Sequence, residues 1–233
     1  MHDVEVSPKI VERVLARRGR YHIFDELDPS ETALVVIDMQ PTFVEPGGPA
    51  EVPKSRGIVE PINSLADELR ALGVTIIWVT HAVAHNSNGS DWDMFYNNFV
   101  ADDIREKTIE SMDPGAAGQQ VWHDFRIADD DLHVVKNRYS ALIPGSSQLE
   151  RVLHSRGLRN LLITGTKTNV CCEATGRDAM MLDFRVVMVS DCLAALSDEE
   201  HQASLETFIQ QFGDVMKSDE VLAVLRRRNN PEA

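Results

Sequence analysis

The chain is poor in cysteine and in positive charge. It has three cysteines among 233 residues, and two of them are adjacent. That is a poor set for a disulfide framework and fits a reducing compartment. Lysine and arginine number 23 against 37 acidic residues, for a net charge of −14. This charge argues against a nucleic-acid partner, which would need a basic face.

Long apolar segments are also missing. No run approaches the roughly 20 residues that a membrane-spanning helix needs. The acidic start, Met1–Glu5, lacks the apolar core of a signal peptide. We therefore expect a cytoplasmic protein with no membrane partner. An apolar content of 43% over this length is enough for one domain with a full core.

The most informative stretch runs from Leu161 to Asp178. It has the pattern of an apolar strand, a turn of Gly, Thr and Asn, and a helix whose first turn carries Cys171. A thiol at a helix start faces unpaired backbone N–H groups and the positive end of the helix dipole, which favour the nucleophilic thiolate. The same N–H groups suit an oxyanion. Cys172 is turned about 100° around the helix and is expected to fill the core.

Two other apolar runs end in ionisable side chains. Residues 33–37 lead into Asp38, and residues 133–135 lead into Lys136. The carboxyl ends of parallel strands meet along one edge of a sheet, where ligands bind. Asp38 as general base, Lys136 as cation and Cys171 as nucleophile would form a coherent set for covalent acyl transfer.

Strand and helix patterns alternate along the chain. We expect strands over residues 33–38, 74–79, 133–136, 160–164, 185–189 and 214–216, and helices over 58–72, 147–155, 171–182, 199–211 and 219–227. This alternation predicts a three-layer αβα domain with a six-stranded, mainly parallel sheet, over residues 32–233.

Two segments stand apart from this pattern. Residues 1–31 are charged and weakly helical near Ile10–Val14, and form an N-terminal arm. The sequence leaves open whether the arm packs on its own domain or on another subunit. Residues 81–130 are irregular, and we expect a long cap over the active site that contains short helices.

Three motifs, in order, carry a resemblance to a known family. They are Asp38-Met-Gln40, Lys136-Asn-Arg-Tyr-Ser140, and Gly165–Cys171 followed by Glu173 to Asp178. They resemble the isochorismatase-like cysteine hydrolases, over about residues 32–225. That superfamily includes nicotinamidase, N-carbamoylsarcosine amidohydrolase and ureidoacrylate amidohydrolase, and the motifs are most similar to those of the last two.

The resemblance implies a Rossmann-like, isochorismatase-type hydrolase fold and a catalytic triad of Asp38, Lys136 and Cys171. It also implies a cis peptide bond between Thr166 and Lys167, which would aim the backbone N–H groups of Lys167 and Cys171 at the oxyanion. The Lys167 side chain either adds charge for an anionic substrate or reaches solvent.

Residues beside these motifs, or in the cap, are candidates to contact substrate. Arg138 would pair either with a substrate carboxylate or with an acidic residue of the cap. The candidates are Gln40, Phe43, Trp92, Arg138, Tyr139 and Asn169.

His81 and His85 are spaced as two zinc ligands on one helix face would be. However, His81 follows a strand directly, and Thr80-His-Ala-Val stands where metal-binding nicotinamidases carry Asp-Trp-His. We therefore predict no catalytic metal and no other cofactor.

The pattern as a whole predicts a cysteine-dependent amidohydrolase that cleaves a C–N bond of a small amide or ureide through a thioester. Two alternatives remain: a vinyl ether hydrolase of the isochorismatase type, and a catalytically silent protein that binds a small molecule. We also expect a homo-oligomer, a dimer or tetramer, because exposed aromatic surface in the cap would mark an interface. That surface is Trp92, Phe95, Tyr96 and Trp122.

Overall fold

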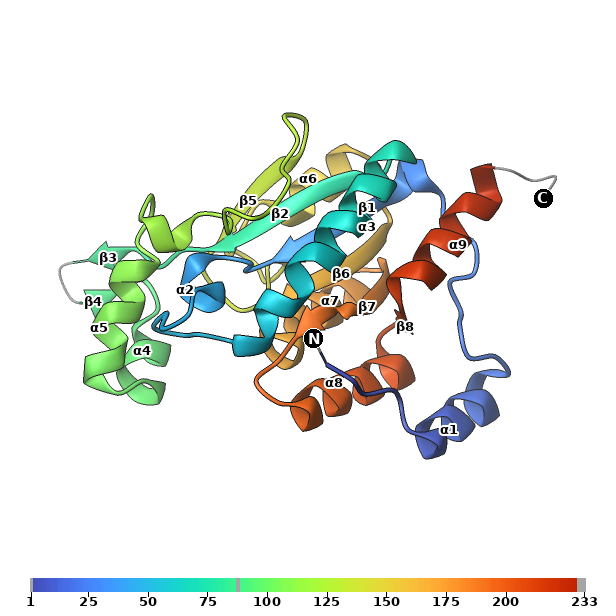
Figure 1. Ribbon diagram of the computed structural model, residues 1–233, viewed down its shortest axis with the longest axis horizontal. Helices are drawn as coiled ribbons and strands as arrows, with labels where there is room; N and C mark the ends of the chain where they lie inside the picture. The colour runs from blue at the N-terminus through green and yellow to red at the C-terminus, as the bar shows by residue number, and fades with distance from the viewer. Residues whose placement is uncertain (1, 87–88, 230–233) are drawn as a thin grey trace.

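A six-stranded, fully parallel sheet forms the centre of the molecule (Figure 1). The computed structural model describes residues 2–86 and 89–229; Met1, residues 87–88 of the predicted cap and residues 230–233 of the predicted domain lie outside it. The strand order is β5-β2-β1-β6-β7-β8. The strands are β1 Thr32–Ile37, β2 Thr75–His81, β5 Leu132–Lys136, β6 Asn160–Thr166, β7 Arg185–Ala194 and β8 Asp214–Met216.

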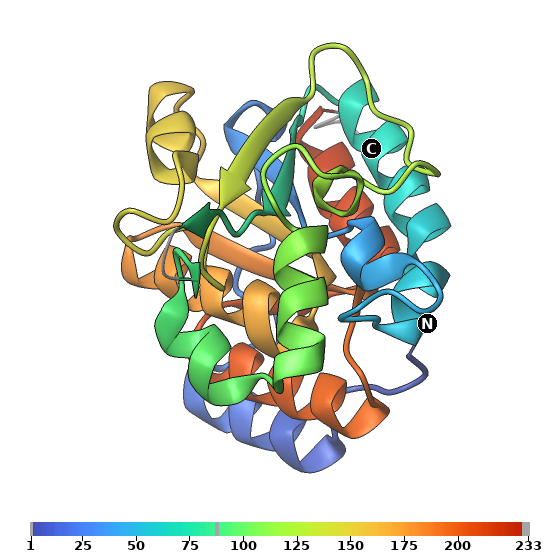
Figure 2. The same cartoon turned by 90° about the vertical axis from the view of Figure 1, so that its left-hand side faces the viewer.

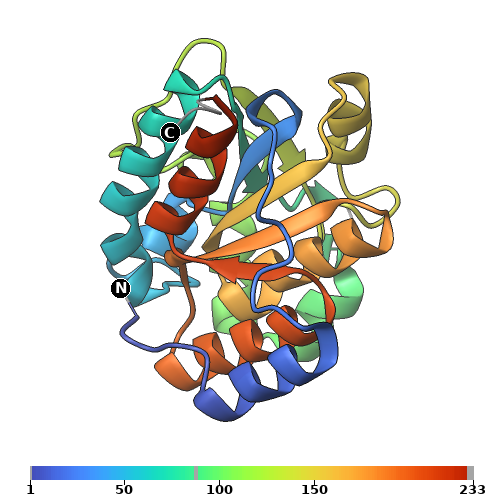
Figure 3. The ribbon, with the colours of Figure 1, turned by 90° about the vertical axis from the view of Figure 1, so that its right-hand side faces the viewer.

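Helices cover both faces of this sheet (Figure 3). Helices α3 (Val59–Ala71) and α9 (Ser218–Asn229) pack on one face, and α6 (Leu149–Ser155), α7 (Glu173–Met181) and α8 (Asp198–Gln211) pack on the other. Alternate residues of β1 belong to the two cores that result, as expected for a strand buried on both sides. The predicted three-layer αβα architecture is confirmed.

The N-terminal arm packs on its own domain. Helix α1 (Pro8–Arg18) buries Ile10 and Val14 in the same core as α8. The chain that follows is held by the buried carboxylate of Asp214, at the start of edge strand β8. Oδ2 of Asp214 accepts hydrogen bonds from the backbone N–H groups of Ile23 and Phe24, at 2.6 and 3.0 Å, while Oδ1 accepts one from Arg18.

The cap extends from the carboxyl end of the sheet and contains short helices, as predicted (Figures 1 and 2). It consists of a small hairpin, β3 (His85–Asn86) and β4 (Gly89–Ser90), the helices α4 (Asp93–Phe99) and α5 (Asp102–Ser111), and a 3₁₀ turn, η3 (Ala117–Gln119). The segment after Asp38 contains the short helix α2 (Pro41–Val44) and the 3₁₀ turn η2 (Pro53–Ile58). Another 3₁₀ turn, η1 (Pro29–Glu31), leads into β1.

Several element bounds differ from the predictions by a few residues, and two of these differences change the local structure. The segment Thr168–Cys172 is a π-helical turn, η4, and α7 begins only at Glu173 rather than at Cys171. Strand β7 continues five residues beyond the predicted end at Val189, after a register irregularity opposite β6. None of the helices in the described part of the chain combines the length and apolarity of a membrane span.

Gly165 allows β6 to approach β1 at the point where the chain enters the turn of Cys171. Its φ is +107°, and a Cβ atom there would lie 2.1 Å from the Ile37 carbonyl oxygen. Gly73 also has a positive φ, +84°, but a Cβ there would meet nothing within 4 Å. A comparison of substitutions at the two glycines therefore separates the cost of a positive φ from the cost of a steric clash.

We predict that Gly73→Ala lowers the free energy of unfolding by about 1–2 kcal/mol, the cost of a left-handed residue. Gly165→Ala should cost clearly more, because overpacking against backbone typically adds about 1–3 kcal/mol. Urea denaturation of the two variants measures the difference. Equal losses would show that β1 and β6 can move apart.

Candidate active site

Asp38 sits at the end of β1 in an unusual backbone conformation. Its φ is +55°, although it is not glycine, and its N–H donates to the Val79 carbonyl of the neighbouring strand at 2.8 Å. The side chain is 1% exposed, and Oδ1 is buried with no hydrogen-bond partner among residues 2–86 and 89–229. Strain at a buried acid is a common mark of a functional site.

Lys136, the last residue of β5, forms a buried ion pair with Asp38. Its Nζ lies 2.8 Å from Asp38 Oδ2 and also donates to the Arg138 carbonyl at 3.0 Å. Burial raises the pKa of Asp38, and the charge of Lys136 offsets only part of this rise. Burial acts to lower the pKa of Lys136, but the charges of Asp38 and Cys171 outweigh it and the pKa is raised. The lysine therefore remains an ammonium ion.

Cys171 completes this group from the turn that follows β6. A ligand-type atom of Cys171, one of Asp38 and one of His81 all lie within 4.8 Å of one another. Burial raises the pKa of the Cys171 thiol, and the negative charge of Asp38 adds to this effect. Both effects oppose the expectation that the helix start would favour thiolate, and they favour a thiol whose proton is taken by a base.

The turn that carries Cys171 is fixed by backbone hydrogen bonds. The peptide bond between Thr166 and Lys167 is cis, at the position that the resemblance implies. The N–H groups of Val170 and Cys172 both donate to the Lys167 carbonyl, at 3.1 and 3.2 Å. Cys172 is fully buried in the core, as expected.

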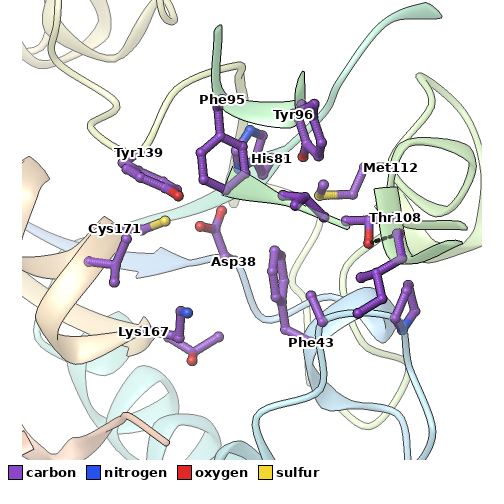
Figure 4. A pocket seen from close by; sticks show the side chains of 16 residues that line it. Asp38, Phe43, His81, Phe95, Tyr96, Thr108, Met112, Tyr139, Lys167 and Cys171 are labelled. Carbon is purple, nitrogen blue, oxygen red and sulfur yellow. Dashed lines mark hydrogen bonds between the residues drawn. The ribbon is translucent and has the colours of Figure 1, made fainter. Parts of the chain in front are cut away.

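A cavity of about 200 Å³ opens beside Cys171 and Asp38 (Figure 4). The sheet contributes its polar end, and the cap and the segment after β1 contribute mainly apolar walls. The lining residues are Asp38, Phe43, Pro49, Ala50, His81, Phe95, Tyr96, Val100, Ile104, Thr108, Met112, Tyr139, Thr166, Lys167, Val170 and Cys171. This combination, an apolar pocket with a few convergent polar groups, is typical of small-molecule sites.

Of the predicted contact residues, Phe43 and Tyr139 line the cavity, as does Lys167. Gln40 instead clamps the neighbouring strand: its Oε1 accepts from the backbone N–H of His81 at 2.6 Å, and its Nε2 donates to the His81 carbonyl at 2.9 Å. Asn169 lies in the Cys171 turn but not on the cavity wall, and its Oδ1 is buried without a partner among the described residues.

Arg138 is occupied by the cap rather than directed at the cavity. Its guanidinium donates to the backbone carbonyls of Asn137 and Asp91 at 2.7 and 3.0 Å, and lies 5.1 Å from the centre of the Trp92 ring. Trp92 packs in turn against Phe95 and Tyr139. Both Arg138 and Trp92 therefore support the wall from behind.

The aromatic residues from which an oligomer was predicted are packed within the chain. Tyr96 is buried, and Trp92, Phe95 and Trp122 are partly buried. The large apolar side chains that do reach solvent on α4 and α5 are Met94, Phe99 and Ile104, at 68%, 71% and 47% exposure. This corrects the reasoning behind the oligomer, which itself stays a prediction.

Sequence reasoning missed most of the cap residues in the wall. Ile104 lies in α5, and Val100 and Met112 directly follow α4 and α5. These helices are too short for their apolar positions to show a clear period. His81 was considered only as a metal ligand. A signal for it did exist, because it stands at the carboxyl end of a buried strand, as Asp38 and Lys136 do.

The trio of Asp38, His81 and Cys171 is the group of possible metal ligands found in the described part of the chain. Nitrogen, sulfur and carboxylate oxygen are ligands that suit zinc. The ammonium of Lys136, 2.8 Å from Asp38, opposes a second cation here. His85, the other candidate ligand, does not line the cavity. The prediction of a metal-independent site stays open.

A family model described as the isochorismatase domain matches residues 32–220, most of the chain. The chain belongs to the isochorismatase family. A curated relative from Arabidopsis thaliana, described as a probable inactive nicotinamidase, is 31% identical over 176 residues, which cover 75% of this chain and 86% of the relative.

Solved structures agree with this assignment. A cysteine hydrolase from Pseudomonas syringae pv. phaseolicola has 29% identity and a TM-score of 0.76, covering 86% of this chain and 94% of its own. An N-carbamoylsarcosine amidase from Thermoplasma acidophilum shares the fold at 23% identity and a TM-score of 0.65, covering 81% of this chain and 97% of its own. The predicted superfamily is confirmed.

We predict that Lys136→Met lowers the free energy of unfolding by about 3–5 kcal/mol, because it leaves the Asp38 carboxylate buried without its cation. The double variant Asp38→Asn/Lys136→Met should regain much of that loss. Chemical denaturation measures both.

Lys217→Met is the matched control for this pair. Lys217 forms an exposed ion pair with Glu5, and such pairs contribute only about 0–1 kcal/mol. A loss in Lys136→Met no larger than in this control would mean that Asp38 is already neutral in the folded protein.

Proposed function

We propose that the protein is a cysteine-dependent amidohydrolase that cleaves a C–N bond of a small amide or ureide through a thioester. One observation carries the proposal. Asp38, Lys136 and Cys171, distant in sequence, converge at the carboxyl end of the sheet, and two of the three line a cavity of small-molecule size. The hydrolase family, shown by most of the chain, supports it.

In the proposed first half-reaction, Asp38 takes the proton of the Cys171 thiol as Sγ attacks the substrate carbonyl carbon. The C=O electron pair moves to oxygen, and the backbone N–H groups of Lys167 and Cys171 would stabilise that oxyanion. As the carbonyl re-forms, the C–N bond breaks, and Asp38 returns the proton to the leaving nitrogen. An amine or ammonia departs and an acyl thioester remains.

In the second half-reaction, water replaces the departed amine beside Asp38. The carboxylate takes a proton from this water as its oxygen attacks the thioester carbon. The C–S bond then breaks, and the sulfur regains a proton from Asp38. Lys136 stays an ammonium ion throughout and stabilises each negative charge as it moves between Asp38, Cys171 and substrate oxygen.

Two other functions are the alternatives to this proposal. A vinyl ether hydrolase of the isochorismatase type does not need a cysteine nucleophile, so a thiol positioned beside Asp38 and Lys136 favours the amidohydrolase. A silent binding protein receives weak support from the relative described as probably inactive. The intact pairing of buried acid and lysine argues against it, because a buried ion pair without a task is costly to keep.

The residues that line the cavity also narrow the proposed substrate class. Arg138, once a candidate for a substrate carboxylate, is bound to the carbonyls of Asn137 and of Asp91 in the cap, and Lys167 is the cationic side chain in the wall that would meet such a group. Because the rest of the wall is mainly apolar, we favour an amide or ureide with an apolar remainder. A cytoplasmic location and a homo-oligomer, in which Met94, Phe99 and Ile104 would be covered, are further parts of the proposal.

Replacement of each adjacent cysteine tests the nucleophile. Cys171→Ala should lose at least about 10³-fold in turnover of an amide panel, because no acyl acceptor remains. Cys172→Ala should keep most of the activity, since this thiol only fills the core. Ammonia release scores the panel, and mass spectrometry of quenched reactions should find the acyl group on Cys171. An acyl adduct on Cys172, or full activity in Cys171→Ala, would refute the assignment.

The rate of thiol alkylation does not distinguish a nucleophilic Cys171 from a structural one. The neutral, buried Cys171 thiol should react slowly with a thiol reagent at pH 7 even as a nucleophile.

The pH dependence of kcat/KM should show an acid limb set mainly by Asp38. The base works only as a carboxylate, so activity falls as pH drops through its pKa. Because burial raises that pKa, the limb should lie above about 4, the ordinary value for aspartate. Rate measurements from pH 4 to 9, with circular dichroism as a check of folding, measure it. A limb at or below 4 would contradict the assigned effect of burial.

A further inference from the structure

His81 is the last residue of β2 and is held at every polar atom but one. The residue is 3% exposed. The Gln40 side chain binds both its backbone N–H and its carbonyl. The parallel register sets it directly opposite Lys136. Nothing in the proposed triad chemistry uses this ring.

The neighbours of the ring define its protonation. Nδ1 lies 3.4 Å from Lys136 Nζ, and an ammonium group can only donate a hydrogen bond. Nδ1 is therefore the acceptor, and the ring hydrogen is on Nε2. Burial, followed by the positive charges of Lys136 and Arg138, holds the pKa of His81 well below its ordinary value. The ring stays neutral at physiological pH, with a fixed N–H donor.

That donor is left without an acceptor among the described residues. Nε2 is buried and has no hydrogen-bond partner in the part of the chain that the structure describes. Buried donors are nearly always satisfied, so one that is not calls for an explanation. The ring lines the cavity beside Asp38 and Cys171 (Figure 4). A ligand in the cavity would supply the missing acceptor.

We propose that His81 is a specificity residue whose neutral Nε2–H donates to an acceptor oxygen of the substrate. The inference rests on the proposed function and deepens it. His81 and Cys171 each offer a ligand-type atom within 4.8 Å of the other, so an acceptor bound by the ring would lie close to the carbon that Cys171 attacks. The surrounding wall is mainly apolar. The substrate class is thus a compact carboxamide or ureide with an oxygen next to the scissile carbonyl and an apolar remainder.

The test pairs two variants with two matched substrate pairs. Methoxyacetamide differs from butyramide by an ether oxygen in place of a methylene, and pyruvamide differs from isobutyramide by an oxo group in place of hydrogen and methyl. His81→Leu removes the donor, whereas His81→Gln keeps an N–H donor. The readout is the ratio of kcat/KM for the oxygen-bearing amide to that for its partner, compared with the ratio in the unmodified protein. This comparison cancels the intrinsic reactivity of each amide.

His81→Leu should lower both ratios by about 10- to 100-fold, the usual effect of one hydrogen bond to a buried acceptor. His81→Gln should keep most of the preference. Equal losses for oxygen-bearing and carbon analogues in His81→Leu would overturn the inference, because they indicate a structural role or a bound water. Acyl adducts on Cys171 with unchanged ratios would sink the inference and keep the proposed amidohydrolase.

A second measurement does not depend on the variants or on turnover. ¹⁵N NMR of the imidazole in the unmodified protein should show hydrogen on Nε2 and none on Nδ1 between pH 6 and 8. An imidazolium signal, or hydrogen on Nδ1, would overturn the inference. Failure of all amides to react in a protein with the expected tautomer would count instead against the proposed function.

Discussion

The structure depends on one interaction, the buried ion pair between Asp38 and Lys136. Both side chains are essentially inaccessible to solvent, so neither charge is tolerable without the other. The pair also joins the end of β1, at the centre of the sheet, to the end of β5, the strand at one edge. It therefore fixes where the cavity floor lies and sets the charge that Cys171 experiences. The cap and the Cys171 turn are arranged around this point.

The same pair also acts on Cys171. Burial raises the pKa of the thiol, the negative charge of Asp38 adds to this rise, and the positive charge of Lys136 opposes it. The net effect is a site with little net charge and mainly apolar walls. Such a site has a strong base and a weak acid in reach of one another, and proton transfer can accompany bond formation.

Much of the fold could be predicted because its strands are buried on both faces. Continuous apolar runs such as residues 33–37 leave little ambiguity, and their ends located Asp38 and Lys136. The π-helical turn at Thr168–Cys172 could not be predicted, since its hydrogen bonds converge on a single carbonyl, that of Lys167, and leave no periodic pattern. The roles of Gln40 and Arg138 were also hidden. Gln40 binds the backbone of His81, and Arg138 binds the backbone carbonyl of Asp91. Backbone atoms are the same in every residue, so the sequence carries no signal for such contacts.

The hold of Asp214 on the N-terminal arm has a consequence for the edge of the sheet. Strand β8 is one of the two outer strands, and an outer strand offers unpaired backbone groups to any chain that can extend alongside it. The arm, bound through Ile23 and Phe24, occupies the approach to β8. It thus acts as a guard against strand-to-strand association. Displacement of the arm would expose the outer edge of β8 to pairing with strands of other chains, which promotes aggregation, while the active site itself stays unchanged.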